Sequence, residues 1–243
     1  TLRIAYYYWI KATNYFQTSF STFDQGWIWS GRAGGYDNNG SSDLAVFDQN
    51  TGAWFIYALD GRTLAWNLKW GWPGAKPVPG DYDGDGISDL AVFDNNTGAW
   101  FIYSLDGRRL AWNVKWGWPG AQPVPGDYDG DGKSDLAVFD NNTGVWFIYS
   151  LDGRRLAWNI KWGWPGAQPV PGDYDGDGKN DLAVLDQNTG AWFIYSLDGR
   201  RLAWNVKWGW PGAKPVPGDY DGDGKSDLAV FDQNTGAWFI YSL

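Results

Sequence analysis

The sequence predicts an all-β fold, a five-bladed β-propeller of four-stranded antiparallel blades. Three observations predict this fold. A unit of about 46 residues recurs along the chain from residue 31 onward. Each unit holds four short runs of branched and aromatic residues, separated by turn signals. No segment shows the 3.6-residue apolar period of a helix. Four-stranded sheets that recur at this spacing are typical of propeller blades.

An aspartate-rich loop marks every full unit. The stretch Asp81–Asp89 reads Asp-Tyr-Asp-Gly-Asp-Gly-Ile-Ser-Asp and recurs at 127–135, 173–181 and 219–227. Carboxylates stand at positions 1, 3, 5 and 9, the glycine at position 6 permits a sharp turn, and the carbonyl at position 7 can add an oxygen. Ca²⁺ takes six to eight oxygen ligands in a flexible geometry. The loops therefore predict about four Ca²⁺ ions, since a simple hairpin turn requires only one Asp-Gly.

The predicted ligands are four aspartates and one backbone carbonyl per loop. They are Asp81, Asp83, Asp85, Ile87 and Asp89; Asp127, Asp129, Asp131, Lys133 and Asp135; Asp173, Asp175, Asp177, Lys179 and Asp181; and Asp219, Asp221, Asp223, Lys225 and Asp227. A fifth loop upstream is altered, because Gly35 replaces the first aspartate and an asparagine replaces the third. We expect weak binding or none there, with Asp37, Asn39 and Asp43 as ligands.

The strands are clearest in the second full unit. We expect strands over residues 123–128, 135–140, 145–151 and 156–164, with an Asp152-Gly153 hairpin turn before the last. The second and third strands are apolar on both faces, as in a sheet sandwiched between two others. The fourth alternates, which predicts that Trp158 faces a neighbouring blade and Ala157 faces water. By the same pattern Trp100, Trp112 and Trp116 fill wedges between blades.

The run Pro-Val-Pro-Gly-Asp-Tyr-Asp-Gly-Asp-Gly-x-x-Asp-Leu-Ala-Val resembles the FG-GAP/VCBS repeat of integrin α-subunit propellers and of many bacterial extracellular proteins. The resemblance covers residues 31–243. It implies that the loop between the first and second strand of each blade binds Ca²⁺. The matching positions are Asp81, Asp83, Asp85 and Asp89 and their equivalents in the three other intact loops.

Closure of the ring is expected to join the two ends of the chain. Four blades occupy about 31–76, 77–122, 123–168 and 169–214, and the last unit, 215–243, stops after its third strand. Residues 14–30 have the length of the absent part, so pairing of the N- and C-terminal segments completes a single domain, 14–243, and removes an open edge.

Residues 1–13 are surplus to that ring and form a strand with Leu2, Ile4, Tyr6, Tyr8 and Ile10 as candidate assembly residues. Three interpretations stay open. The strand folds back on the closing blade, or it adds to a neighbouring molecule and builds head-to-tail fibres, or it is a remnant of a longer chain.

Composition limits the chemistry. The chain has no Cys, no His and no Glu, which excludes disulfides and His-dependent catalysis and gives no reason to expect an enzyme. The net charge of −9 lies mostly in the loops, and four bound Ca²⁺ would bring it to about −1. The sequence lacks the basic stripe expected of a protein that binds nucleic acid. It also lacks an apolar run long enough for membrane insertion. Millimolar Ca²⁺ outside cells favours an extracellular or cell-surface location.

The sequence therefore predicts a non-enzymatic, calcium-binding propeller with a structural or adhesive role, which self-associates into fibres through its N-terminal strand. The alternative is a lectin with repeated aromatic sites for a cell-surface glycan, in which exposed tryptophans of the Gly-Trp-Pro-Gly turns stack on sugars. Those are Trp72, Trp118, Trp164 and Trp210. Asn39, Asn95 and Asn141 stand in glycosylation sequons.

Overall fold

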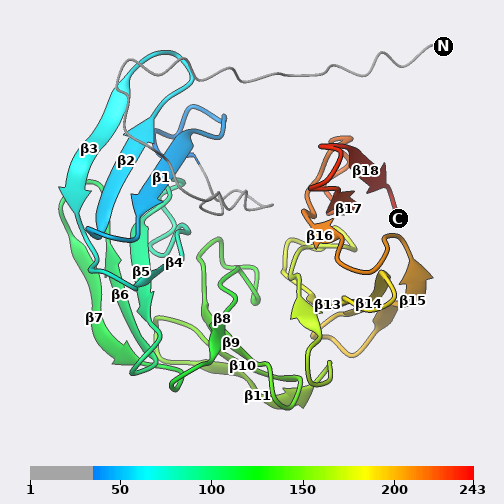
Figure 1. Ribbon diagram of the computed structural model, residues 1–243. Helices are drawn as coiled ribbons and strands as arrows, with labels where there is room; N and C mark the ends of the chain where they lie inside the picture. The colour runs from blue at the N-terminus through cyan, green and yellow to red at the C-terminus, as the bar shows by residue number, and fades with distance from the viewer. Residues whose placement is uncertain (1–34) are drawn as a thin grey trace.

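The computed structural model describes residues 35–243, in which all regular elements are β-strands. They form five antiparallel sheets that follow one another around a ring (Figure 1). Blade 1 contains β1 (Leu44–Asp48), β2 (Ala53–Tyr57) and β3 (Thr63–Lys69). Blade 2 contains β4 (Lys76–Pro77), β5 (Leu90–Asp94), β6 (Ala99–Tyr103) and β7 (Arg109–Lys115).

The next two blades repeat this order. Blade 3 contains β8 (Gln122–Pro123), β9 (Leu136–Asp140), β10 (Val145–Tyr149) and β11 (Arg155–Lys161). Blade 4 contains β12 (Gln168–Pro169), β13 (Leu182–Asp186), β14 (Ala191–Tyr195) and β15 (Arg201–Lys207). Blade 5 contains β16 (Lys214–Pro215), β17 (Leu228–Phe231) and β18 (Trp238–Tyr241).

This arrangement confirms the predicted all-β, five-bladed propeller. Blades 2, 3 and 4 have four strands each, and blades 1 and 5 have three strands each within residues 35–243. The predicted closing segment 14–30 and the surplus strand 1–13 lie outside the described residues. No helix within residues 35–243 has the length and apolarity that a membrane crossing demands.

The second strand of each inner blade is buried on both faces. In β5 all four residues from Leu90 to Phe93 are 0% exposed. One face, with Leu90 and Val92, packs on the preceding blade, and the other face packs on the following blade. Leu136 and Val138 of blade 3, for example, belong to the same cluster as Trp100 of blade 2. The continuous apolar character of this strand in the sequence predicted this double burial.

Tryptophans join neighbouring blades. The backbone carbonyl of Trp116 accepts a hydrogen bond from Trp100 Nε1 of its own blade (2.7 Å). The Nε1 of Trp116 in turn donates to the carbonyl of Phe147 in the next blade (3.2 Å), and its ring stacks on Tyr149 at 4.5 Å. The predicted wedge-filling role of Trp100 and Trp116 is confirmed.

The outer strand corrects the predicted alternation. Trp112 and Trp158 are 59% and 53% exposed, whereas Ala111 and Ala157 are buried at 5%. The cause is a β-bulge at the following asparagine: Asn113 and its counterparts take φ near +60°, and the register shifts there. A bulge changes which parity faces inward, so the tryptophan before it turns outward and the tryptophan after it turns inward.

The first strand is shorter than expected. It pairs regularly over only two residues in blades 2 to 5, such as Gln122–Pro123 in blade 3. Pro125 has no N–H to donate, so the ladder continues only as single contacts. These are the Val124 N–H to the Ala137 carbonyl (2.9 Å) and the Gly126–Asp135 bridge, which sits at the mouth of the aspartate loop.

Blades 1 and 5 carry exposed apolar faces. Leu44 and Val46 of β1 are 45% and 60% exposed, although their equivalents Leu90 and Val92 are fully buried. Trp238 of β18 is 45% exposed, against 0% for its counterparts in blades 2, 3 and 4. Both faces occupy positions that another blade or strand covers elsewhere in the ring.

Candidate metal centres

The side chain of Asp81 organises its loop. One carboxylate oxygen accepts the N–H of Gly84 (2.6 Å) and the other accepts the N–H of Gly86 (2.8 Å). Gly86 has φ +83°, a left-handed conformation that L side chains rarely adopt. The equivalent contacts occur in the three other intact loops, so the motif folds the same way each time.

The last aspartate of the loop lies in the protein interior. Asp89 is 1% exposed, and its Oδ2 accepts the Tyr82 N–H at 2.8 Å. Its Oδ1 is buried and has no hydrogen-bond partner among residues 35–243. Burial, together with repulsion by Asp83, Asp81 and Asp85, raises the pKa of Asp89 to about 7. The pKa of Asp135 and of Asp181 also rises to about 7, mainly through burial.

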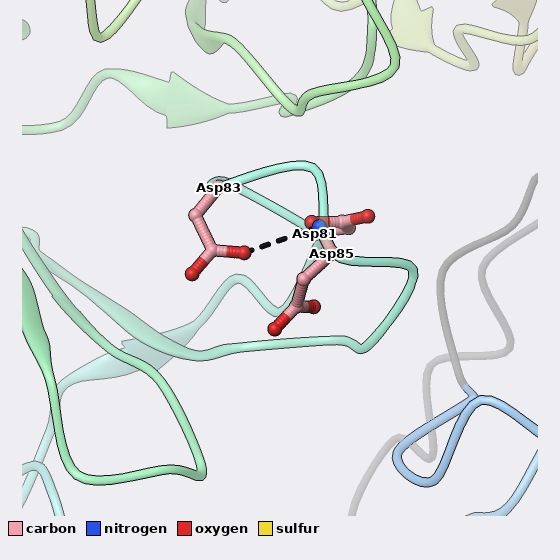
Figure 2. Close-up of side chains that lie close together, drawn as sticks. All are labelled: Asp81, Asp83 and Asp85. Atoms are coloured by element: carbon pink, nitrogen blue, oxygen red, sulfur yellow. Dashed lines mark hydrogen bonds between the residues drawn. The ribbon is translucent and has the colours of Figure 1, made fainter.

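The aspartates of each intact loop converge. In four groups, three carboxylates each offer an oxygen within 4.8 Å of the others: Asp81, Asp83 and Asp85; Asp127, Asp129 and Asp135; Asp173, Asp175 and Asp181; Asp219, Asp221 and Asp227. Figure 2 shows the first group gathered at one turn, with the Asp83 carboxylate accepting the Asp85 N–H. The groups can hold metal ions. A buried, unpartnered carboxylate oxygen beside other carboxylates requires a cation or a proton.

An arginine from the following hairpin contacts each of the first three intact loops. Arg108 Nη2 lies 2.7 Å from Asp83 Oδ2, and Arg108 Nε lies 2.5 Å from Asp106 Oδ2. Arg154 and Arg200 repeat this pairing. Sequence reasoning missed these arginines. The recurrence of Asp-Gly-Arg at the repeat spacing was the signal that could have found them.

A family model described as an FG-GAP-like repeat matches residues 81–138, 127–184 and 173–230, which together span most of the chain and all its intact loops. The chain belongs to the FG-GAP-like repeat family. The predicted resemblance is thereby confirmed. No curated protein matches the chain in a sequence comparison.

Two solved structures resemble this FG-GAP-like propeller. One is a lectin of Agrocybe aegerita that recognises non-reducing terminal N-acetylglucosamine, with TM-score 0.56 and 16% identity over 82% of this chain and 59% of the lectin. The other is virginiamycin B lyase from Staphylococcus aureus, with TM-score 0.52 and 13% identity over 87% of this chain and 69% of the lyase. The chain thus spans little more than half of the lectin. At such identities the likeness shows the fold alone.

The altered first loop keeps part of the FG-GAP-like framework. Asp43 Oδ2 accepts the Tyr36 N–H (2.7 Å), just as Asp89 Oδ2 accepts the Tyr82 N–H in the next blade. Asp37 forms an ion pair with Arg62. Gly35 offers no carboxylate, and the Asn39 side chain donates to Asp37 (3.0 Å). Among residues 35–243 this loop has no convergent group of three acidic side chains.

Of the predicted glycosylation positions, Asn39 lies in the altered loop, and the other two lie outside the aspartate loops. Asn141 is exposed in the turn after β9, and Asn95 is half-buried in the turn after β5. Ile87, Lys133, Lys179 and Lys225 occupy position 7 of the loops, where the backbone carbonyl is the predicted ligand.

Proposed function

We propose that this chain is a non-enzymatic, calcium-stabilised FG-GAP-like propeller that serves an extracellular structural or adhesive role. One observation carries the calcium assignment: Asp89 Oδ1 is buried and has no hydrogen-bond partner among residues 35–243. The equivalent aspartates of the other intact loops, Asp135, Asp181 and Asp227, are buried as well. A divalent cation bound there would neutralise carboxylates that otherwise repel one another.

The donor set favours Ca²⁺. Each intact loop presents carboxylate oxygens only, without nitrogen or sulfur, since the chain has neither His nor Cys. Hard oxygen donors suit Ca²⁺ and Mg²⁺, and a loop with several carboxylates suits Ca²⁺ better, because Mg²⁺ retains several waters. Aspartates at positions 1, 3, 5 and 9 would hold the ion, with the position 7 carbonyl as a further oxygen.

The ion would act on the ring as well as on the loop. The Ser134 N–H of the third blade donates to the Asp81 carbonyl of the second (2.5 Å), and the Asn180 N–H donates to the Asp127 carbonyl (2.6 Å). Asp81, Asp127 and Asp173 are therefore both proposed ligands and backbone contacts to the next blade. A bound ion that rigidifies the loop should stabilise the junction between blades.

Calorimetric titration of EDTA-stripped protein with CaCl₂ tests this proposal, with thermal unfolding as a second readout. We expect about four equivalents and a higher Tm in calcium, because a ligand that binds only the folded state raises stability by mass action. Asp89→Asn should remove one equivalent. The matched control is Asp140→Asn, which changes an aspartate in a turn outside the loops. Equal Tm values in EDTA and in calcium would refute the proposal.

The adhesive role rests on the fold and on the absence of catalytic residue types. The chain has no His, Cys or Glu, which are common nucleophiles and general bases in enzymes. We propose that residues 1–13 mediate head-to-tail association. Electron microscopy of the full chain and of a chain lacking these residues tests that role. Filaments that persist after the deletion would exclude it.

A lectin is the second candidate, and the exposed outer-strand tryptophans favour it. Trp66, Trp112, Trp158 and Trp204 are 75%, 59%, 53% and 59% exposed, and the residue type is normally well buried. The Gly-Trp-Pro-Gly tryptophans are instead partly buried, and Trp118 packs edge-on against Phe147 of the next blade. Binding to a glycan array in calcium would support this candidate.

A further inference from the structure

An aromatic and basic belt runs along the outer strands of the ring. We define the rim belt as Trp66, Trp112, Trp158 and Trp204 with Arg109, Arg155 and Arg201. These residues lie on β3, β7, β11 and β15, which form the outside of the ring (Figure 1). Every member is exposed. The belt repeats with the blades, so any ligand site there would be present several times.

Each belt arginine lies over the tryptophan of its own strand. The guanidinium carbon is 5.2 Å from the ring centroid for Arg109 and Trp112, 4.6 Å for Arg155 and Trp158, and 5.1 Å for Arg201 and Trp204. A guanidinium stacked on an indole keeps its N–H edge free for a planar anion. More than half of each tryptophan remains exposed beside it.

The belt arginines differ from their immediate neighbours. Arg108, one residue before Arg109, pairs with the carboxylates of Asp83 and Asp106. Arg109, Arg155 and Arg201 have no ion pair among residues 35–243. The arginines thus fall into two sets. Arg108, Arg154 and Arg200 pair with loop carboxylates, and the guanidinium groups that have no ion pair among residues 35–243 lie on the rim.

Protection of an edge strand does not account for the belt. Charged residues on an outer strand do block pairing with other molecules. A large exposed indole works against that protection, because it adds apolar surface at the same edge. The bulge at Asn113 turns Trp112 outward, and the same left-handed asparagine follows the belt tryptophan in the three other blades.

We propose that the rim belt binds an acidic polysaccharide. This inference rests on the lectin candidate above and names its ligand class and its residues. The apolar face of a pyranose ring would pack on the exposed indole, and a carboxylate of the same or the next sugar would bind the free N–H edge of the arginine. Blades 2, 3 and 4 would each contact one ring and one charge, and several blades on one polymer give avidity.

The geometry favours a polysaccharide over single-stranded nucleic acid. Proteins that bind single strands use a basic groove that follows the phosphate backbone. Here the platforms stand on separate outer strands of a protein with net charge −9. A ligand that offers isolated rings with isolated charges fits that arrangement better than a continuous polyanion of stacked bases.

Biolayer interferometry of the calcium-loaded full chain tests the proposal. The surfaces are carboxymethyl-dextran and unmodified dextran, which share a backbone and differ in carboxylates, with poly(dT) as a third. We expect binding to carboxymethyl-dextran that weakens with added salt and exceeds binding to dextran by at least about tenfold, or ~1.4 kcal/mol.

The variants use residues that the chain itself carries at equivalent positions. Arg109→Thr, Arg155→Thr and Arg201→Thr copy Thr63 of blade 1. Together they should weaken carboxymethyl-dextran binding at least about tenfold. The control, Lys76→Gln with Lys214→Gln, copies Gln122 and Gln168, and should leave binding unchanged. Trp112→Ala, Trp158→Ala and Trp204→Ala should abolish binding while circular dichroism stays native.

Three results would overturn the proposal. Equal binding to dextran and carboxymethyl-dextran would remove the charge requirement and leave a neutral-sugar lectin. Tighter binding to poly(dT) would make nucleic acid the ligand. A calcium-saturated, folded protein that binds neither dextran surface would refute the acidic-polysaccharide site without affecting the calcium proposal, which depends on titration and Tm.

Discussion

The backbone N–H of Ser134 donates a 2.5 Å hydrogen bond to the carbonyl of Asp81, one blade earlier in the ring. The same contact joins Asn180 to Asp127 and Ser226 to Asp173. In the altered first loop, the carbonyl of Gly35 accepts the Ser88 N–H at 2.8 Å. The link between blades therefore survives the loss of the position 1 side chain, which separates the proposed metal-binding role of that side chain from the role of the backbone carbonyl.

Asp127→Gly exploits that separation. The variant should fold, because residue 127 keeps the backbone carbonyl that contacts the next blade. It should bind about one calcium ion fewer than the parent, because the loop loses the carboxylate that accepts the N–H groups of Gly130 and Gly132. Calorimetric stoichiometry measures the change. An unchanged stoichiometry would show that Asp127 is not a ligand, and a collapse of the fold would show that its side chain holds the ring.

Calcium and protons should compete for the buried aspartates. Without metal, the folded-state pKa of Asp89, Asp135 and Asp181 is about 7, above the ordinary value of 3.8. A raised folded pKa means stability that is complete below pH ~4 and is lost as pH rises through 7. The EDTA-treated protein should therefore melt at a lower temperature at pH 8 than at pH 5.

Calcium should reverse this trend, because the ion requires ionised carboxylates. The difference in Tm between calcium and EDTA should be larger at pH 8 than at pH 5. Thermal scans at both pH values, in matched ionic strength, measure the two trends. A calcium effect that is greatest at pH 5 would contradict the assignment of these aspartates as ligands.

Trp116 and Trp112 form a matched pair for the blade junction. Trp116→Phe removes the Nε1 donor to the Phe147 carbonyl while it keeps an aromatic ring near Tyr149, so the free energy of unfolding should fall by about 1 kcal/mol. Trp112→Phe changes a ring that is 59% exposed and should stay within about 0.5 kcal/mol of the parent. Urea unfolding compares them. A larger fall in the free energy of unfolding for Trp112→Phe than for Trp116→Phe would contradict the assignment of Trp116 to the blade junction and of Trp112 to the outer surface.

Closure of the ring makes different predictions for two deletions. Removal of residues 1–13 should leave a folded protein. Removal of residues 1–30 should lower Tm and promote aggregation, because the apolar faces at Val46 and Trp238 would lack their cover. A synthetic peptide of residues 14–30 should restore Tm to the shorter chain. Two deletions with equal Tm would show that residues 14–30 take no part in closure.

The sequence by itself determined the repeat, the order of the strands and the aspartate loops. These features depend on local patterns: a fixed spacing between copies, apolar runs bounded by turns, and carboxylates brought together within nine residues by two glycines. A loop such as Asp81–Asp89 is held mainly by its own backbone N–H groups, so its geometry hardly depends on the rest of the chain.

Only the tertiary structure decided which tryptophans face water and which aspartate is buried without a partner. Alternation predicted that Trp112 and Trp116 share one face, but a single left-handed residue, Asn113, shifts the register between them. Asp89 resembles its loop neighbours in sequence, yet packing against Tyr82 and the adjacent strands removes it from solvent. Both outcomes depend on contacts between distant residues, which a linear pattern does not contain.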